Sequence, residues 1–342
     1  MTSPDVTIVV CTFNRASLLS GALDSLSKLD FSDVCSCEVL VVDNGSSDHT
    51  PQIVIDAADR YDVPIRYCRE SEPGIAAARN RGVRSSRTSW IAFFDDDQIA
   101  DIGWLSGLLT VASEENARFV LGSRLLLLSD DELGRLARHC RAVLGELTEP
   151  KDRFRYEGKI GGSTGNMLVH SSVFDDIGGF NAVTIEGGED ADLFERVVTA
   201  GIDAWYTADA VVYHVVPPYR LQPAYFRWTC RRQGIHVSRA ERYRWGAMGF
   251  PIAFSARFIQ LCLVLVPRLF WARLARDPRA IMDAKCRVWR AEGCLRKGLG
   301  VMAPRLMKQE KFFASLEFRS EREIFSDGER NHRDQVTERG QE

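Results

Sequence analysis

The chain has 342 residues, of which 45% are hydrophobic and 27% are charged. This composition can bury a sizeable core and excludes a disordered tail or a disulfide-stabilised miniprotein. The nine cysteines show no repeated Cys-x-x-Cys or Cys/His spacing, which argues against a disulfide framework or a structural zinc site and indicates a reducing compartment. The first residues lead directly into an apolar strand, so we expect no secretory signal.

The net charge of −3 conceals a strong asymmetry along the chain. Residues 1–218 carry a net charge of −15, residues 219–311 carry +15, and residues 312–342 carry −3. A segment with such a positive charge is attracted to anionic lipid or polyphosphate, whereas the acidic body is not. A solvated helical face would show the same charge, so two interpretations of the basic segment stay open.

Four apolar runs in the first third of the chain each precede a helical pattern. They are 6–11 before 18–29, 38–42 before 50–60, 65–68 before 74–85, and 90–94 before 104–116. Because these strands are continuously apolar, the β–α alternation predicts a parallel sheet with helices on both faces. Polar groups then gather at the carboxyl ends of the strands, where an open α/β sheet binds ligands.

The remaining elements are expected to close the sheet and then to become helical. We predict a helix at 130–147, a polar linker at 148–159, strands at 167–170, 204–207 and 211–214, and helices from residue 222 onward. No internal repeat is evident.

The most apolar stretch of the chain is 258–266, and four arginines follow it closely. A membrane span needs roughly 20 apolar residues, and the window 246–267 reaches that length only by including Arg257 and Gln260. We therefore expect an interfacial helix with a basic face on lipid headgroups rather than a span. A plain packed helix is the alternative.

The triplet Asp95, Asp96 and Asp97 follows the predicted strand 90–94. Burial of three adjacent carboxylates without a counter-charge is prohibitively costly, and a cation is the usual remedy. In extended backbone, Asp95 and Asp97 would face the same side and could share one Mg²⁺ or Mn²⁺, while Asp96 turns away or reaches a ligand hydroxyl. An acidic surface turn that caps the next helix is the alternative.

Two further clusters follow the first and second strands. Asp43 ends the second strand and could accept hydrogen bonds from a ribose or a base edge, although a capping Asp would look the same. After the first strand stand Thr12, Phe13, Asn14 and Arg15, where a dinucleotide-binding protein would carry GxGxxG, and this argues against NAD.

A second acidic site begins a later helix. Glu189 and Asp190 follow Gly187 and Gly188, at a helix N-terminus that favours anions. An Asp kept ionised there could take a proton from an attacking hydroxyl, although an ordinary acidic cap is the alternative. His214 ends a late strand, and it is either a third metal ligand or a core histidine.

Together these motifs resemble the family 2 inverting glycosyltransferases with the GT-A nucleotide-sugar-binding fold. The matching segments are 6–15, 41–48, 73–82, 95–97, 177–180 and 188–193. They cover about residues 5–215 in the family's order. The resemblance implies an α/β fold with a Rossmann-like, mostly parallel central sheet flanked by helices, followed here by a C-terminal helical extension.

The resemblance also implies roles for individual residues. Those assigned to the nucleotide sugar are Thr12, Phe13, Asn14, Arg15, Asp43, Arg79, Asp95 and Asp96. Asp95 and Asp97 would form the metal-binding DxD motif for Mn²⁺ or Mg²⁺, with His214 as a candidate third ligand. Asp190, next to Glu189, would be the general base. Gly165 and Asn166 would line the sugar and acceptor cleft.

The implied enzyme is a hexosyl- or deoxyhexosyltransferase of cell-envelope glycans. Its expected partners are a UDP- or dTDP-sugar, a glycan or lipid-linked acceptor and an anionic membrane surface at the cytoplasmic face, and not nucleic acid. The Phe-Asp-Glu triplet common in the family is replaced by Phe180, Asn181 and Ala182, so altered sugar or acceptor contacts are expected. The processive signature Gln-x-x-Arg-Trp is not evident, which favours addition of one sugar per encounter.

We expect three regions. Residues 1–220 would form the catalytic domain, with a nucleotide-sugar half (about 1–125) and an acceptor half (about 126–220). Residues 221–316 would form the basic helical extension, and 317–342 a charged tail. Two other functions fit part of the pattern: a sugar nucleotidyltransferase, which would need a Gly-rich loop after the first strand, and a non-catalytic nucleotide-sugar sensor on the membrane.

Overall fold

The structure, a computed structural model, describes residues 5–32, 34, 36–149, 152–158, 162–181 and 188–302. The expectations for the charged tail, for Gly187 and for Ala182 lie outside these residues.

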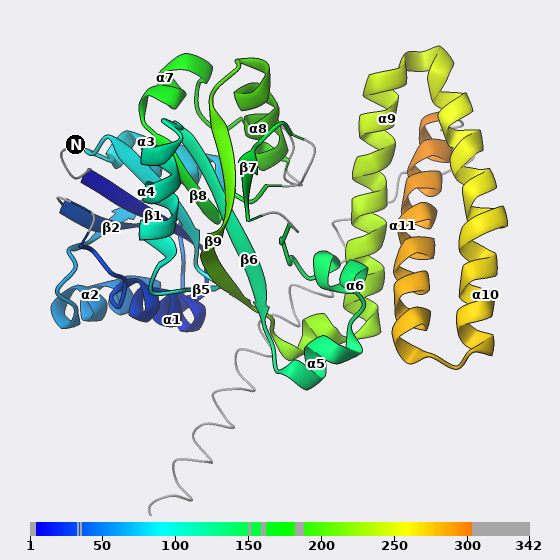
Figure 1. Cartoon of the computed structure of the whole chain (residues 1–342), viewed down its shortest axis with the longest axis horizontal. Helices are drawn as coiled ribbons and strands as arrows, with labels where there is room; N and C mark the ends of the chain where they lie inside the picture. The colour runs from blue at the N-terminus through cyan, green and yellow to red at the C-terminus, as the bar shows by residue number, and fades with distance from the viewer. Residues whose placement is uncertain are drawn as a thin grey trace, which may run out of the picture.

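A nine-stranded sheet forms the centre of the first two thirds of the chain (Figure 1). Its strand order is β3-β2-β1-β4-β8-β6-β9-β5, and β7 pairs with β9. The strands are β1 (Asp5–Thr12), β2 (Ser36–Asp43), β3 (Ile65–Arg69), β4 (Trp90–Asp95), β5 (Gln98–Ala100), β6 (Phe119–Leu127), β7 (Arg153–Arg155), β8 (Asn166–His170) and β9 (Ala204–Val215).

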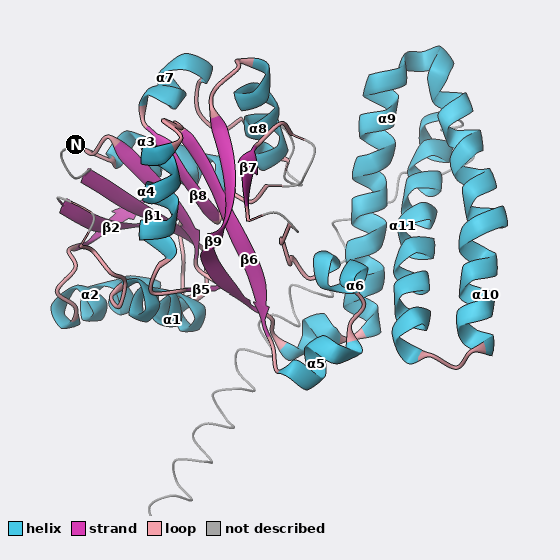
Figure 2. Cartoon of the chain, viewed as in Figure 1, coloured by secondary structure: helices cyan, strands magenta, loops and turns pink. Residues whose placement is uncertain are grey.

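Helices cover both faces of this sheet (Figure 2). They are α1 (Ala16–Leu26), α2 (Thr50–Arg60), α3 (Ile75–Ser85), α4 (Trp104–Glu114), α7 (Ser172–Ile177) and α8 (Glu189–Thr199). Alternate residues of each strand enter opposite cores: Ile8 and Phe94 pack with α1, α2 and α4, whereas Val9 and Phe93 pack with α3, α7 and α8. Continuous apolar strands are therefore buried on both sides, as predicted.

The pairing of the sheet changes sense at β4. Strands β3, β2, β1 and β4 are mutually parallel, β8 is antiparallel to both β4 and β6, and β6 is parallel to β9. The predicted α/β class with a C-terminal helical region is confirmed. The parallel arrangement is confined to the first four strands and the β6–β9 pair.

Several later elements differ from the prediction. The expected helix at 130–147 is two short helices, α5 (Asp130–Arg135) and α6 (Arg138–Val143), because Leu136 and Ala137 adopt extended backbone. The two short strands expected between 204 and 214 are one strand, β9, with a register irregularity opposite β6. The expected polar linker contains β7.

The chain then forms three long helical segments beside the sheet. A short 3-10 helix, η1 (Pro218–Leu221), leads into α9 (Pro223–Gln260). Helix α9 continues through a π-helical turn, η2 (Leu261–Leu265), into α10 (Val266–Leu274). The last helix is α11 (Pro278–Met302). Gly246 has non-helical backbone angles (φ 63°, ψ −167°). The chain reverses there, so residues 247–274 run antiparallel to the first part of α9 (Figure 1).

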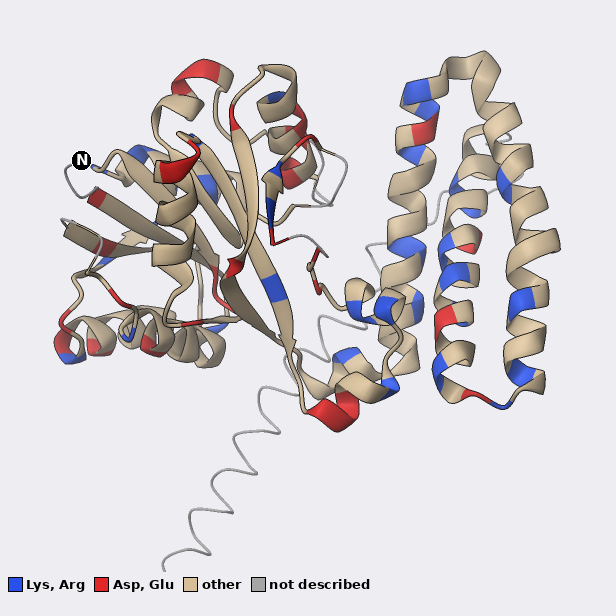
Figure 3. Ribbon diagram, viewed as in Figure 1, with Lys and Arg blue, Asp and Glu red and all other residues tan. Residues whose placement is uncertain are grey.

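The helix after Gly246 is apolar and exposed. Pro223–Leu274 contains an apolar stretch with few charged residues, and almost all of this stretch is exposed. Among the described residues this is the one helical stretch that is long and apolar enough, by length and composition, to cross a membrane. Lys and Arg are prominent on α9 and α11, and many acidic residues lie on the sheet domain (Figure 3).

Candidate active site

The register of the parallel strands brings the predicted polar clusters together at one edge of the sheet. Thr12 pairs with Asp43 across β1 and β2, and Cys11 pairs with Asp95 across β1 and β4. On the other side of β4, Phe94 pairs with Asn166, the first residue of β8. The first-strand cluster, Asp43, the Asp triplet and the segment before β8 therefore meet at the carboxyl ends of β1, β2 and β4.

The loop after β1 is held against the loop after β2. Asn14 adopts a positive φ of 51°, its backbone N–H donates to Ser46 Oγ at 2.9 Å, and its Oδ1 accepts from the Ser47 N–H at 2.8 Å. Asn is among the residues that tolerate this left-handed conformation. These contacts leave the Phe13 ring half exposed at the mouth of the site.

Asp43 is fully buried at the base of this loop pair. Its Oδ1 accepts from the Ser46 N–H at 2.8 Å and its Oδ2 from the Tyr67 hydroxyl at 2.7 Å. The carboxylate thus has the internal hydrogen bonds of a capping Asp in this structure. Carboxylate oxygens can accept more than one bond each, so a further donor from a ligand is compatible with this arrangement.

The Asp triplet does not lie in extended backbone. Asp95 ends β4, and Asp96 and Asp97 form the turn into β5. Arg15 Nη1 donates to Asp96 Oδ1 at 2.7 Å and to Asp97 Oδ2 at 3.2 Å. The extended backbone expected across the triplet is therefore not observed, because Asp96 and Asp97 lie in a tight turn and both accept from Arg15.

Asp97 is surrounded by basic side chains. His214 Nε2 lies 3.5 Å and Arg220 Nη2 3.4 Å from its Oδ2. Burial opposes its ionisation, yet the positive charges of Arg15 and Arg220 hold the pKa of Asp97 below its ordinary value. Two guanidinium groups therefore keep a buried carboxylate charged.

His214 has the environment of a core histidine in this structure. Arg220 Nη1 lies 2.8 Å from His214 Nε2, and because a guanidinium can only donate, Nε2 is the acceptor. The Nδ1 atom is buried and has no hydrogen-bond partner among the described residues. A metal ion on Nε2 would have to displace Arg220.

Asp95 lies against Gly165 and Gln98. A Cβ atom on Gly165 would come within 2.0 Å of Asp95 Oδ2, so any larger residue at this position requires the Asp95 carboxylate to move. Although 32% of the Asp95 side chain is exposed, desolvation raises its pKa to about 6, against the opposing effect of Arg79. Gln98 Nε2 lies 3.5 Å from this carboxylate, and the buried Gln98 Oε1 atom has no hydrogen-bond partner within the described part of the chain.

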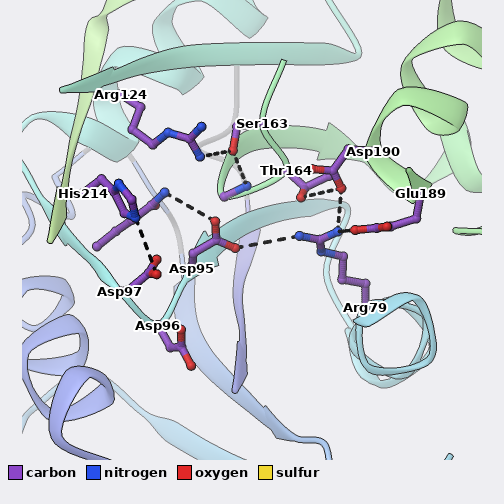
Figure 4. A network of polar contacts seen from close by, with 12 residues as sticks. Arg79, Asp95, Asp96, Asp97, Arg124, Ser163, Thr164, Glu189, Asp190 and His214 are labelled. Carbon is purple, nitrogen blue, oxygen red and sulfur yellow. Dashed lines mark hydrogen bonds and ion pairs between the residues drawn. The ribbon is translucent and has the colours of Figure 1, made fainter. Parts of the chain in front are cut away.

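Arg79 joins the two acidic clusters. Its guanidinium donates to Glu189 Oε1 at 2.8 Å and to Asp190 Oδ1 at 2.5 Å, and its Nη2 lies 3.8 Å from Asp95 Oδ1 (Figure 4). The Arg79 side chain is 8% exposed and stacks over Phe180 at 5.5 Å. One buried cation thus stands between carboxylates from β4 and from the start of α8.

The N-terminus of α8 is shaped to hold this cluster. Gly188 has a φ of 111°, a left-handed conformation that favours glycine, and it caps the helix directly before Glu189. Thr164 Oγ1 donates to Asp190 Oδ1 at 3.0 Å from the segment that precedes β8. Asp190 therefore has two neighbours that orient its carboxylate toward the site.

Asn166 has a structural role rather than the cleft-lining one expected for it. Its side chain is 1% exposed, accepts from Trp104 Nε1 at 2.8 Å, and donates to the carbonyls of Ser123 and Ala210 at 2.7 and 2.9 Å. All its bonds are used inside the core, where they tie α4, β6 and β9 together.

Sequence reasoning missed five neighbours of the site. They are Thr164, Tyr67, Phe180, Arg124 and Arg220. Thr164 belongs to a glycine-rich segment that could have indicated it. The arginines carry no such signal, because only seven of the 44 basic residues are Lys and arginines occur throughout the chain.

Residues 7–178 match the family described as Glycosyl transferase family 2. This is half of the chain, and the chain belongs to that family. The Pre-mycofactocin glycosyltransferase of Mycobacterium tuberculosis is 31% identical over 214 residues, which are 61% of this chain and 42% of that protein. Glycosyltransferase AglE of Haloferax volcanii is 26% identical over 64% of this chain and 69% of that protein.

Solved structures of the same fold include two with nucleotide sugars. The mannosyltransferase PcManGT of Pyrobaculum calidifontis, in complex with GDP-Man and Mn²⁺, has a TM-score of 0.51 and 18% identity, covering 94% of this chain and 83% of its own. S. aureus TarS 1–349 in complex with UDP-GlcNAc has a TM-score of 0.51 and 14% identity, covering 88% and 92%. The predicted GT-A fold is confirmed.

No cluster of three or more potential ligands is arranged for a metal ion within the part of the chain that the structure describes. The donors present nevertheless suit a hard cation. Asp95, Asp97 and Gln98 provide oxygen atoms, which Mg²⁺ and Mn²⁺ prefer.

Proposed function

We propose that the chain is a metal-dependent inverting glycosyltransferase that moves one sugar per encounter from a nucleotide-diphosphate donor to an acceptor hydroxyl. The observation that carries this proposal is the Arg79 bridge between Asp95 and Asp190. Asp95 of the candidate DxD motif lies 3.8 Å from this guanidinium and the candidate base Asp190 lies 2.5 Å from it, so both carboxylates contact the same cation. A large distance between the Asp triplet and Asp190 would have been incompatible with the reaction, because both must reach the same donor sugar.

Asp190 is the proposed general base. It accepts the proton of the acceptor hydroxyl while the hydroxyl oxygen bonds to the anomeric carbon and the bond from that carbon to the diphosphate oxygen breaks. The electron pair of the broken bond stays on the diphosphate, and a single in-line displacement inverts the anomer. General-base catalysis of this kind typically contributes about 10²–10⁴-fold to the rate.

Arg79 is the proposed ligand of the donor diphosphate. A guanidinium binds phosphate oxygens in a bidentate manner, and Arg79 is preorganised by its contacts with Phe180, Glu189 and Asp190. Positive charge at this point stabilises the leaving group where its negative charge develops.

Asp95 and Asp97 are the residues that would hold a divalent ion, Mn²⁺ or Mg²⁺. When bound, the ion would add positive charge beside the leaving diphosphate. The PcManGT complex contains Mn²⁺ with GDP-Man, which supports the assignment. The protein's own contribution is to keep Asp97 ionised through Arg15 and Arg220.

A UDP- or dTDP-sugar is the favoured donor, with Asp43 beneath the base or ribose. The UDP-GlcNAc complex of TarS supports a uridine donor, and the GDP-Man complex of PcManGT shows that other bases occur in this fold. A screen of nucleotide release over a panel of sugar nucleotides, with Mn²⁺, Mg²⁺ or a chelator, would identify the donor and test the metal requirement.

A lipid-linked or glycan acceptor at an anionic membrane surface is the proposed second substrate. One relative, 33% identical over 125 residues, is a GalNAc(5)-diNAcBac-PP-undecaprenol beta-1,3-glucosyltransferase of Campylobacter jejuni, whose name contains a polyprenyl diphosphate. The exposed apolar helix after Gly246 offers a surface that could contact lipid.

The decisive variant is Asp190→Asn. It should still bind the nucleotide sugar and lower kcat by about 10²–10⁴-fold, because the amide cannot accept the proton. Glu195→Gln, an exposed residue of the same helix, is the matched control and should leave kcat unchanged. Absence of turnover in both the wild type and the variant would indicate a nucleotide-sugar sensor. Full activity of Asp190→Asn would show that Asp190 is not the general base.

A further inference from the structure

A partly open cavity of about 220 Å³ lies between the C-terminal helices and α6. Its volume is more than ten times the roughly 10–15 Å³ that one water molecule requires. Residues from α6, both arms of α9, η2 and α11 line it: His139, Val237, Arg257, Gln260, Leu265, Arg287, Arg290, Ala291 and Cys294. Three arginines and a histidine line the cavity, and none of the lining residues is acidic.

The arginines are only partly neutralised by neighbouring acids. Arg257 donates to Glu241 at 2.7 and 2.8 Å, and Arg287 shares Asp283 with Arg268. For Arg290, no ion pair is recorded with any residue that the structure describes. Four guanidinium groups around this cavity therefore face two carboxylates, which leaves excess positive charge.

His139 adds a polar ring atom to the cavity lining. Its Nε2 atom is buried and has no hydrogen-bond partner among the described residues. Burial, with Arg287 next, lowers the pKa of this imidazole, while Asp283 opposes the effect. A buried polar atom without a partner is costly, and a bound oxyanion would satisfy it.

We propose that this cavity binds a phosphate group. Phosphate is the oxyanion that arginine forks match best, and Arg257, Arg287 and Arg290 present three of them from two helices. The group could come from a membrane lipid headgroup or from free phosphate. Leu265 and Gln260 on the cavity wall belong to the exposed apolar helix that follows Gly246, so a lipid could place its phosphate inside and its chains along that helix.

This site is separate from the transfer reaction, because none of its lining residues belongs to the candidate active site. Its test uses the full chain. Flotation with phosphatidylcholine vesicles, with and without phosphatidic acid, reports the lipid source, and calorimetric titration with inorganic phosphate reports the free anion. We expect binding in at least one of these two experiments.

Two variants test whether the cavity is responsible. Arg290→Gln removes a charged donor without breaking a recorded ion pair, and it should weaken binding about tenfold. Ala291→Leu fills the cavity and should weaken binding at least as much. Nucleotide-sugar turnover on a soluble acceptor should be unchanged in both, which separates this proposal from the transferase function.

Arg279→Gln is the matched control, because it removes the same charge from an exposed position of α11 that does not line the cavity. It should bind as the wild type does. Equal losses in Arg279→Gln and Arg290→Gln would show that overall charge, not this cavity, attracts phosphate. Unchanged binding in Arg290→Gln and in folded Ala291→Leu, or no binding by the wild type to either probe, would overturn the proposal.

Discussion

Gly165 illustrates how a single missing side chain shapes the site. A Cβ atom there would overlap Asp95 Oδ2 and lie 2.8 Å from Gln98 Nε2. The sequence predicted that Gly165 belongs to the cleft, but not that it touches the first Asp of the triplet. That contact depends on the antiparallel pairing of β4 with β8, which no local pattern in the sequence reports.

Gly165→Ala should lower kcat/KM at least tenfold while changing the free energy of unfolding by only about 1 kcal/mol, because the carboxylate of Asp95 can move away from the new methyl group at the expense of its position. Gly134→Ala, where an added Cβ meets no atom within 4 Å, is the control and should keep full activity. Steady-state kinetics and thermal unfolding measure both effects. Wild-type kcat/KM in Gly165→Ala would contradict the placement of Asp95 in the site.

Asn166 makes the opposite point, because a residue expected in the cleft stabilises the core. Asn166→Ala should lower the free energy of unfolding by about 2–4 kcal/mol, since the Trp104 indole N–H and two carbonyls lose their partner. Asn181→Ala, at an exposed position, should change it by less than about 0.5 kcal/mol. Equal stability of the two variants in urea unfolding would argue against the core role of Asn166.

At the scale of elements, helices and strands with an uninterrupted hydrophobic pattern were predicted well, and those with an interrupted pattern were not. Helix α2 has the predicted bounds, and the four parallel strands lie within two residues of theirs. Strand β6 was not predicted because Gly122, Ser123 and Arg124 interrupt its apolar run. Strands β5 and β7 have three residues each, which is too short for a periodic signal, and their place is fixed by pairing with β9.

A polar contact between neighbouring strands gives a pH-dependent prediction. Glu38 on β2 accepts from Arg66 on β3 at 2.8 and 3.2 Å and from Thr7 on β1 at 3.1 Å. Arg66 is the main reason that the pKa of Glu38 lies below its ordinary 4.5. A lowered pKa in the folded state adds stability that is present above pH 4.5 and is lost as the pH falls through the folded-state pKa.

Glu38→Gln should therefore lower the free energy of unfolding by about 1 kcal/mol at pH 7, a value that allows for the partial exposure of the pair. The difference from the wild type should shrink as the pH falls below 4.5. Denaturant titrations across this range measure it, with Glu195→Gln as the surface control. A constant difference at every pH would show that packing, not charge, is the cause.

At the scale of the whole molecule, the basic segment expected from the charge asymmetry is a helical unit with an apolar outer face. The charge and the apolar stretch could be read from the sequence. The reversal at Gly246 could not, because a lone glycine in a helical pattern usually leaves the helix intact. That reversal exposes residues 247–274 instead of extending α9.

Leu263, which is 72% exposed, tests whether this face contacts lipid. Leu263→Glu should reduce flotation with anionic vesicles severalfold, because a charge at the apolar boundary is costly, while the unfolding temperature stays unchanged. Ile55→Glu places the same charge on an exposed apolar position of α2 and should float as the wild type does. Equal flotation of the wild type and both variants would show that the apolar face does not contact lipid.

The position of Arg79 also decides how an incoming diphosphate would be received. The guanidinium is already neutralised by acids from the end of β4 and from the start of α8, so the free protein contains its own internal counterion. A diphosphate that binds Arg79 must therefore replace these carboxylates as the partner of the guanidinium. The measured affinity for the diphosphate would then be a small difference between the attraction of Arg79 to the diphosphate and its attraction to the three carboxylates. The same exchange would release the Asp190 carboxylate just when a proton acceptor is needed.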